Sequence, residues 1–133
     1  MVDFTPEARQ FLQKPWIGRL ATTKADGAPH VVPLWYILDG DDVVIISERK
    51  TAKIAHLLRD NRAALLVGGE PENGPAYLLQ GRVTITDDPV HAMTERVTRH
   101  YESPEQAEKD LAEWAAFDMV ILRLTVERVT KAF

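Results

Sequence analysis

The sequence predicts a mainly β fold of the α+β class, in which six antiparallel strands and a few flanking helices form one small barrel. Six segments rich in strand-forming residues follow one another, mostly in hairpin order, and helical patterns are few. Because a small sheet avoids exposed edges by curling onto itself, we expect the barrel to be closed or half-closed. The length of 133 residues predicts a single domain over residues 1–133.

The first element is expected to be a short helix over residues 6–13. Thr5 supplies a hydroxyl cap, Pro6 suits the first turn, and Glu7 is favoured by the positive end of the helix dipole. The helix should end before Pro15, because the residue that precedes a proline is biased away from helical backbone angles.

Two hairpins follow in series. Residues 16–24 are rich in strand formers, a glycine-containing turn occupies 25–28, and residues 29–38 form the second strand. An aspartate-glycine turn signal then leads into a third strand at 42–47. Consecutive hairpins of this kind predict an antiparallel meander.

A helix is expected to begin near Thr51. Ile54, Leu57 and Leu58 fall on one face at helical spacing, with basic residues around them, which is typical of an amphipathic helix.

The rest of the chain is expected to supply three strands and two helices. In the strand at 76–88, Val83 and Ile85 alternate with polar residues, so one face of that strand is expected to be wet. Trp114 and Phe117 stand at helical spacing and are predicted to be core or dimer contacts. The other elements expected are a strand at 63–69, helices at 89–101 and 103–117, and a closing strand at 119–133.

The second strand is apolar on both faces, apart from one histidine. In a simple barrel only one face of a strand is buried, so the other is expected to meet a partner subunit, a flat aromatic ligand, or the helices. Pro33 cannot donate a hydrogen bond to the ladder, which places it at an edge, a bulge, or a point where another group approaches. Together these features favour a ligand or subunit interface. The two faces are Val31, Pro33, Trp35 and Ile37 on one side, and His30, Val32, Leu34, Tyr36 and Leu38 on the other.

Five of the sixteen basic residues lie within residues 49–62, although the formal net charge is −4. Lys50, Thr51 and Lys53 cluster at the start of the expected helix, where unpaired N–H groups and the helix dipole favour an anion and disfavour cations. The cluster therefore predicts an anion site of the kind that holds phosphate. Arg59 and Arg62 are expected on a solvated face.

The composition excludes several classes of protein. There is no cysteine, which removes disulfides, thiolate catalysis and cysteine-based zinc sites, and the four histidines have no paired spacing typical of metal ligands. An acidic chain is not expected to bind nucleic acid. The apolar runs are too short to span a membrane, and the N-terminal segment does not resemble a signal peptide, so a cytoplasmic protein is expected. Serines at positions 47 and 103 do not lie in a nucleophile elbow.

The order of these parts resembles the flavin-binding split β-barrel superfamily named after pyridoxamine 5′-phosphate oxidase. Within it, the chain is similar to the short single-domain branch that includes deazaflavin-dependent reductases. The resemblance covers nearly the whole chain and rests on LAT, DG-x-P, P-x-WY, a lysine followed by RDNRAALLV, and LLQGRVTITDD. It implies a split β-barrel homodimer with two cofactors, FMN in the first instance, bound at the subunit interface.

The resemblance also implies which residues line the cofactor site. The second strand would flank the isoalloxazine ring, the end of the third strand would lie near the sugar-like chain, and the start of the following helix would hold the phosphate. A glutamine before the glycine of the fifth strand would reach the cofactor from the partner chain. In that order, the implied residues are His30, Val32, Pro33, Leu34 and Trp35; Ile46 and Ser47; Thr51 and Lys53 with Lys50 nearby; and Gln80.

The chain departs from the oxidase at two points. Ala52 stands where the oxidase usually has an arginine between the hydroxyl and the lysine, and the C-terminal stretch lacks the substrate-binding arginine-leucine-x-proline pattern. Oxidation of vitamin B6 is therefore not expected.

The leading functional hypothesis is an FMN-dependent oxidoreductase that transfers hydride between the flavin and a small-molecule substrate. A reductase that uses the deazaflavin coenzyme F-420 is the first alternative, and a non-enzymatic flavin- or haem-binding protein is the second. The local site suits one compact phosphate, which favours FMN. No catalytic residue is assigned, because the cofactor ring carries the hydride chemistry and requires no side chain as acid or base.

Overall fold

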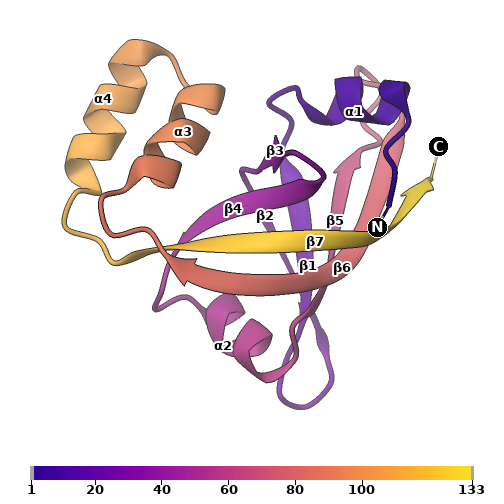
Figure 1. Cartoon of the computed structure of the whole chain (residues 1–133), viewed down its shortest axis with the longest axis horizontal. Helices are drawn as coiled ribbons and strands as arrows, with labels where there is room; N and C mark the ends of the chain where they lie inside the picture. Colours follow the sequence, from indigo (N-terminus) through magenta and orange to yellow (C-terminus); the bar gives the residue numbers. More distant parts are fainter. Residues whose placement is uncertain (1, 133) are drawn as a thin grey trace.

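One antiparallel sheet organises the fold (Figure 1). A computed structural model describes residues 2–132, and in that part of the chain the sheet has seven strands in the order β2-β1-β5-β6-β7-β4-β3. Phe133, the last residue of the predicted closing strand, lies outside the described residues. The elements are α1 (Pro6–Leu12), β1 (Gly18–Thr23), β2 (Pro29–Leu34), β3 (Ile37–Asp39), β4 (Asp42–Glu48), α2 (Ala52–Arg59), β5 (Arg62–Gly68), β6 (Ala76–Asp87), α3 (Ala92–Tyr101), α4 (Pro104–Glu113) and β7 (Met119–Lys131).

The mainly β, antiparallel fold class is confirmed, but the prediction of six strands was wrong. The predicted second strand breaks at Trp35 and Tyr36, which separates β2 from β3. The cause lies far along the chain, because the Tyr101 hydroxyl accepts a 3.0 Å hydrogen bond from the Tyr36 N–H. The same hydroxyl lies 2.7 Å from the Trp16 carbonyl oxygen and 2.8 Å from that of Tyr36, so it can donate to either. A side chain thus satisfies backbone groups that a continuous ladder would have paired.

The sheet curls but does not close by strand pairing within residues 2–132. β2 and β3 are its two end strands, and the β3–β4 ladder stops at Ile37 and Val44. Residues 45–48 of β4 pair with β7 alone. The free edge of β2 and the free edge of this half of β4 therefore flank an opening, which makes the barrel half-open.

The interior of the curled sheet holds the main core. Its most buried side chains are leucines, isoleucine and valines from β1, β4, β5, β6 and β7, with Leu12 of α1 and Tyr36. A second, smaller cluster of Ile37, Val44 and Val97 lies between β3, β4 and helix α3. Figure 1 shows the α3–α4 hairpin on one side of the sheet, with α1 and α2 at opposite ends.

Two burial predictions have different outcomes. The predicted wet face of the fifth predicted strand is confirmed, because Val83 of β6 is buried whereas Arg82 and Thr84 are exposed. The apolar face of α2 is narrower than the spacing predicted. Ile54 and Leu57 are buried, but Leu58 is 74% exposed because it lies on the solvent side of this short helix.

The outer face of β2 is not covered by the helices of the described chain. Val31 is 58% exposed and Pro33 is also exposed, whereas α3 packs on the far part of the sheet, against β4. The explanation that helices cover this apolar face is therefore wrong for Val31 and Pro33. A partner subunit or a ligand remains as the expected neighbour.

None of the helices in residues 2–132 combines the length and the apolar character required to cross a lipid bilayer.

Candidate functional site

Three of the sequence-predicted residues, Ser47, Thr51 and Lys53, come together where β4 leads into α2. The Ser47 and Thr51 hydroxyl oxygens are 2.9 Å apart, and the Lys53 ammonium donates to the Thr51 hydroxyl at 3.3 Å. Thr51 also donates to the carbonyl oxygen of Glu48 at 3.0 Å. Two hydroxyl groups and one ammonium thus form a compact cluster at the first turn of a helix, which is a geometry suited to an anion.

The N-terminus of α2 is open compared with those of α1 and α4. Thr5 and Ser103 each accept a hydrogen bond from a backbone N–H of their own helix, at 3.1 and 3.2 Å. Thr51 makes no such bond, because its hydroxyl is turned toward Ser47 and the Glu48 carbonyl. The first turn of α2 also has no acidic residue, unlike the first turns of α1 and α4. The partial positive charge of this helix end is therefore uncompensated by its own residues.

Lys53 is half-buried, and no carboxylate of residues 2–132 lies within ion-pair distance of its ammonium group. Burial lowers the pKa of its ammonium group from the ordinary value, while the more distant Glu48 carboxylate acts in the opposite direction. A desolvated ammonium beside an open helix N-terminus is stabilised by a bound anion, and a perturbed lysine in such a place is a candidate for function.

The other basic residues of this segment are engaged elsewhere or exposed. Lys50 is 82% exposed and its ammonium lies 3.6 Å from the Glu48 carboxylate. Arg49 bonds to both Asp87 and Asp118, so it ties the start of the α2 segment to the start of β7. Arg59 and Arg62 are exposed as predicted, and Arg62 pairs with Asp60 at 2.7 Å. Of the predicted phosphate ligands, Lys50 therefore stands apart from the cluster.

The residues predicted to flank the ring do not share one surface. In β2, the side chains of Val32 and Leu34 pack against the main core, whereas Pro33 is exposed on the outer face. Trp35 lies beyond the end of β2 and stacks on Tyr101, with ring centroids 5.0 Å apart and an interplanar angle of 6°. Val32, Pro33 and Leu34 nevertheless belong to the edge strand β2, and Trp35 follows it directly.

His30 faces helix α2 and lies next to a second histidine. The rings of His30 and His56 meet edge to face, with centroids 4.8 Å apart, and His56 Nδ1 is 3.0 Å from the Thr22 hydroxyl. Burial lowers the pKa of His56 from its ordinary value, and His30, Arg59 and Lys24 act in the same direction, so the neutral form of His56 is favoured. The Nδ1 atom of His30 is buried without a hydrogen-bond partner among the described residues. His56 stands one turn after Lys53 on α2, which brings this unpaired atom to the same end of the barrel as the anion cluster.

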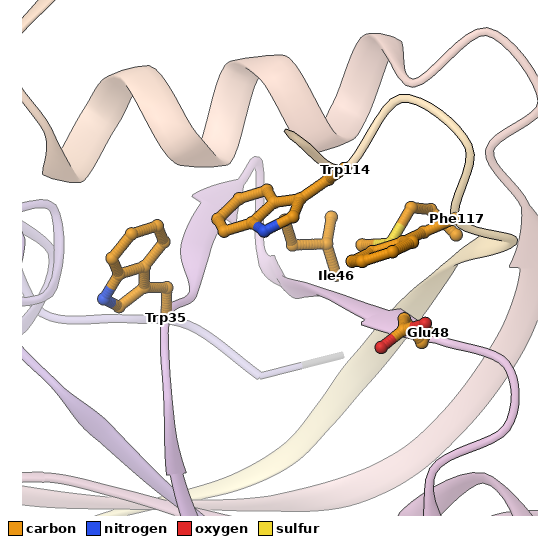
Figure 2. A pocket seen from close by; sticks show the side chains of 6 residues that line it. Trp35, Ile46, Glu48, Trp114 and Phe117 are labelled. Carbon is orange, nitrogen blue, oxygen red and sulfur yellow. The ribbon is translucent and has the colours of Figure 1, made fainter. Parts of the chain in front are cut away.

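Trp35 and Ile46 line an open cleft of about 230 Å³, and the sequence analysis missed its other walls (Figure 2). These walls are Glu48 of β4, Trp114 and Phe117 of the turn after α4, and Met119 of β7. Trp114 and Phe117 were predicted within a helix, but α4 ends at Glu113, and the turn that follows places both rings at the cleft instead of in the core. Their spacing was the available signal, although it did not show where the helix would end.

Gln80 lies far from this cleft, on the outer face of the sheet. The register pairs Val31 with Ala21, Ala21 with Ala64, and Ala64 with Gln80, so these four side chains form one row across β2, β1, β5 and β6. Gln80 also borders a hollow of about 440 Å³ whose charged walls are Arg62, Arg82 and Glu127.

No group of three or more His, Asp or Glu side chains in residues 2–132 has an arrangement that could hold a metal ion.

The fold and this cluster define a class of protein: a small, half-open antiparallel barrel with two hydroxyl groups and an ammonium gathered at the helix that follows its fourth strand. The chain belongs to the pyridoxamine 5′-phosphate oxidase family, since the family model with that description matches residues 4–132. No match was found among curated proteins.

Solved structures share this fold over nearly the whole chain. An F420 reductase is 24% identical with a TM-score of 0.76, and the alignment covers 97% of this chain and 98% of that one. The conserved hypothetical protein Rv2991 from Mycobacterium tuberculosis is 21% identical with a TM-score of 0.76, covering 98% and 85%. A FAD-binding protein from Mesorhizobium loti is 23% identical with a TM-score of 0.65, covering 96% and 92%. At these identities the similarity is one of fold.

Proposed function

We propose that this protein is an FMN-dependent oxidoreductase that transfers hydride between the flavin and a small-molecule substrate. The observation that carries the proposal is the cluster of Ser47, Thr51 and the desolvated Lys53 at the open N-terminus of α2. A phosphate bound there would accept hydrogen bonds from the ammonium and from the two hydroxyl groups, which would turn toward it from the Glu48 carbonyl oxygen, and would meet the positive end of the helix.

The residues around the cluster also fit the rest of FMN. His30 Nδ1 is a buried polar atom without a partner among the described residues, and it lies on the β2 side of the opening. The free edges of β2 and of residues 45–48 of β4 would border the ring, with Trp35 at its far end. When bound, FMN would supply the hydride chemistry, and the chain would supply the anion site, the apolar walls and the orientation.

A compact phosphate suits the site better than a long acidic tail. Arg49 is held by Asp87 and Asp118, and Lys50 pairs with Glu48, so the surface beyond the cluster is not a free basic groove. The deazaflavin coenzyme F420 is nevertheless the second candidate, because the chain shares its fold with an F420 reductase over 97% of its length.

Lys53→Ala is expected to weaken FMN binding by roughly 10- to 100-fold, because a hydrogen bond to a charged group contributes about 1.5–3 kcal/mol. Absorbance and fluorescence titration of purified protein with FMN and with F420 measures the effect and ranks the two cofactors. Lys14→Ala is the matched control, since it removes the same charge from an exposed site at the α1 end of the molecule. Equal FMN affinity in wild type and Lys53→Ala would refute the phosphate site. A haem Soret band in the purified protein would instead favour a binding protein.

The proposal includes a homodimer with the cofactor at the subunit interface. The outer row of Val31, Ala21 and Ala64 is apolar and uncovered in the described chain, and Gln80 extends the same row. A partner that covers this row would bury Gln80, in keeping with the expectation that this side chain reaches the cofactor of the other subunit.

Val31→Glu is expected to convert the dimer to a monomer and to weaken FMN binding, because it places a charge at the β2 end of the apolar row, where the valine is exposed. Size-exclusion chromatography with light scattering measures the molar mass of the protein. FMN titration measures the change in cofactor affinity. Val90→Glu is the control, since Val90 is 83% exposed and outside this face. A monomeric wild-type protein with FMN bound would overturn the interface site.

A further inference from the structure

The cofactor proposal assigns no occupant to the cleft beside Trp35. Trp35, Trp114 and Phe117 supply three aromatic rings, Ile46 and Met119 supply its apolar floor, and Glu48 stands at one side (Figure 2). Its volume of about 230 Å³ is smaller than the clefts of roughly 300–1,000 Å³ that hold drug-sized ligands. A compound of one or two fused rings matches this space.

The walls of the cleft are held in place by contacts outside it. Trp35 stacks flat on Tyr101, whose hydroxyl is fixed between backbone groups of Tyr36 and Trp16. On the other side, the Trp114 N–H donates to the Asp110 carbonyl oxygen and the Phe117 N–H donates to that of Trp114, both at 2.9 Å. These bonds shape the turn that carries the two rings. A preformed aromatic cleft loses little conformational freedom when a flat ligand enters.

The charge of the cleft distinguishes anionic ligands from neutral and cationic ones. Glu48 is the one ionisable residue among the six that line it, and among the described residues its carboxylate forms an ion pair only with the exposed Lys50, at 3.6 Å. A ligand with a carboxylate or sulfonate would bring a second negative charge next to Glu48, which is unfavourable. Neutral and cationic aromatic compounds avoid this repulsion, and cations also gain from the aromatic faces.

The cleft lies directly across β4 from the anion cluster. Ile46 and Glu48 line it, whereas Ser47, which stands between them, is buried with the cluster on the other face. Glu48 also links the two places through its backbone, because its carbonyl oxygen accepts hydrogen bonds from the Thr51 and Ser47 hydroxyl groups at 3.0 Å. A ligand in the cleft would therefore adjoin a cofactor whose phosphate occupies the cluster and whose ring ends near Trp35.

From this arrangement we infer that the cleft is the substrate subsite, and that it selects a planar aromatic compound of one or two rings without negative charge. Trp114 and Phe117 recognise the ring, and Glu48 excludes anions. That the ligand of the cleft is a substrate rests on the proposed function. The ligand selectivity of the cleft, by contrast, does not depend on a bound cofactor.

The test compares two isosteric probes, naphthalene-2-carboxamide and naphthalene-2-carboxylate, by calorimetric titration of the cofactor-free protein. The amide is expected to bind at least tenfold more tightly than the carboxylate. Glu48→Gln is expected to remove this difference by improving the carboxylate while leaving the amide affinity unchanged, which a merely structural role of Glu48 would not do. Trp114→Ala is expected to weaken amide binding tenfold or more, and Val90→Ala, an exposed position outside the cleft, is the control.

Equal affinities for the two probes in the wild type, or full amide affinity in Trp114→Ala, would overturn the cleft assignment. A second titration, with FMN already bound, tests whether the ligand binds next to the flavin, as a substrate must. The amide is expected to perturb the visible absorption band of the flavin, and its binding without any perturbation would overturn the subsite. Failure of FMN to bind at all would refute the proposed function while the probe results on cofactor-free protein stand separately.

Discussion

Gly81→Ala is expected to lower the free energy of unfolding by about 4 kcal/mol or more, a size that only a few kinds of substitution reach. A Cβ atom at Gly81 would lie 1.9 Å from the carbonyl oxygen of Thr125 and 2.9 Å from its carbonyl carbon. Both atoms belong to the backbone of β7, so no side-chain rotation can relieve the clash. Strands β6 and β7 would have to separate at the centre of their long ladder.

The close approach at Gly81 comes from a β-bulge. The ladder pairs Gln80 with Arg128 but Gly81 with Val126, which leaves Glu127 as the extra residue on β7. A bulge increases local twist and brings the two backbones together, and the missing side chain of glycine makes room for this.

Urea denaturation of Gly81→Ala and Gly74→Ala measures the effect against a matched control. Gly74 has a positive φ of 79°, but a Cβ there would meet no atom within 4 Å. Gly74→Ala should therefore lower the free energy of unfolding only by the backbone strain, which is about 1–2 kcal/mol. A Gly81→Ala protein as stable as the Gly74→Ala protein would show that β6 and β7 can shift apart at little cost.

Features set by neighbouring residues were predictable from the sequence. The cap at Thr5 is confirmed, because it involves a hydroxyl group and an N–H group only three residues later. The cluster of Ser47, Thr51 and Lys53 spans only seven positions, so its members were certain to be close once a strand led into a helix.

Features set by distant residues were not predictable in this way. The break between β2 and β3 depends on Tyr101, which stands 65 residues after Tyr36. The aromatic cleft needs Trp35 and Trp114 from opposite parts of the chain, and it also needs α4 to end at Glu113. The bulge on β7 left a trace in the sequence, because apolar alternation up to Val126 is interrupted by Glu127 and Arg128 before it resumes one position out of phase at Val129.

Tyr101→Phe is expected to lower the free energy of unfolding by about 2–3 kcal/mol, because it removes one hydroxyl group from three partly buried backbone groups. The Tyr36 N–H would lose its acceptor, and the carbonyl oxygens of Trp16 and Tyr36 would lose their donor. Tyr77→Phe is the matched control, since Tyr77 is buried, whereas Tyr101 is half-buried, and no hydrogen bond of the Tyr77 hydroxyl is found in the described chain. Thermal or urea unfolding of the two variants compares how much each hydroxyl group contributes to stability. If Tyr101→Phe were as stable as Tyr77→Phe, the bridging role of Tyr101 would be contradicted.

The pH dependence of stability gives an independent measure of the same hydroxyl. Burial raises the pKa of Tyr101 to about 12, although its hydrogen bond with the Tyr36 backbone acts in the opposite direction. The unfolded chain releases this proton near its ordinary value of 10.0, so the stabilisation is complete below pH 10.0 and is lost as pH rises toward about 12. Burial also raises the pKa of Tyr36, so that residue contributes to the same decline. Between pH 9 and 11 the free energy of unfolding should therefore decrease less steeply with pH in Tyr101→Phe than in the wild type. Because Tyr36 still contributes, the decrease should not disappear. An unchanged slope would mean that Tyr101 ionises as readily in the folded protein as in water, which is incompatible with a hydroxyl held between the backbone of Tyr36 and that of Trp16.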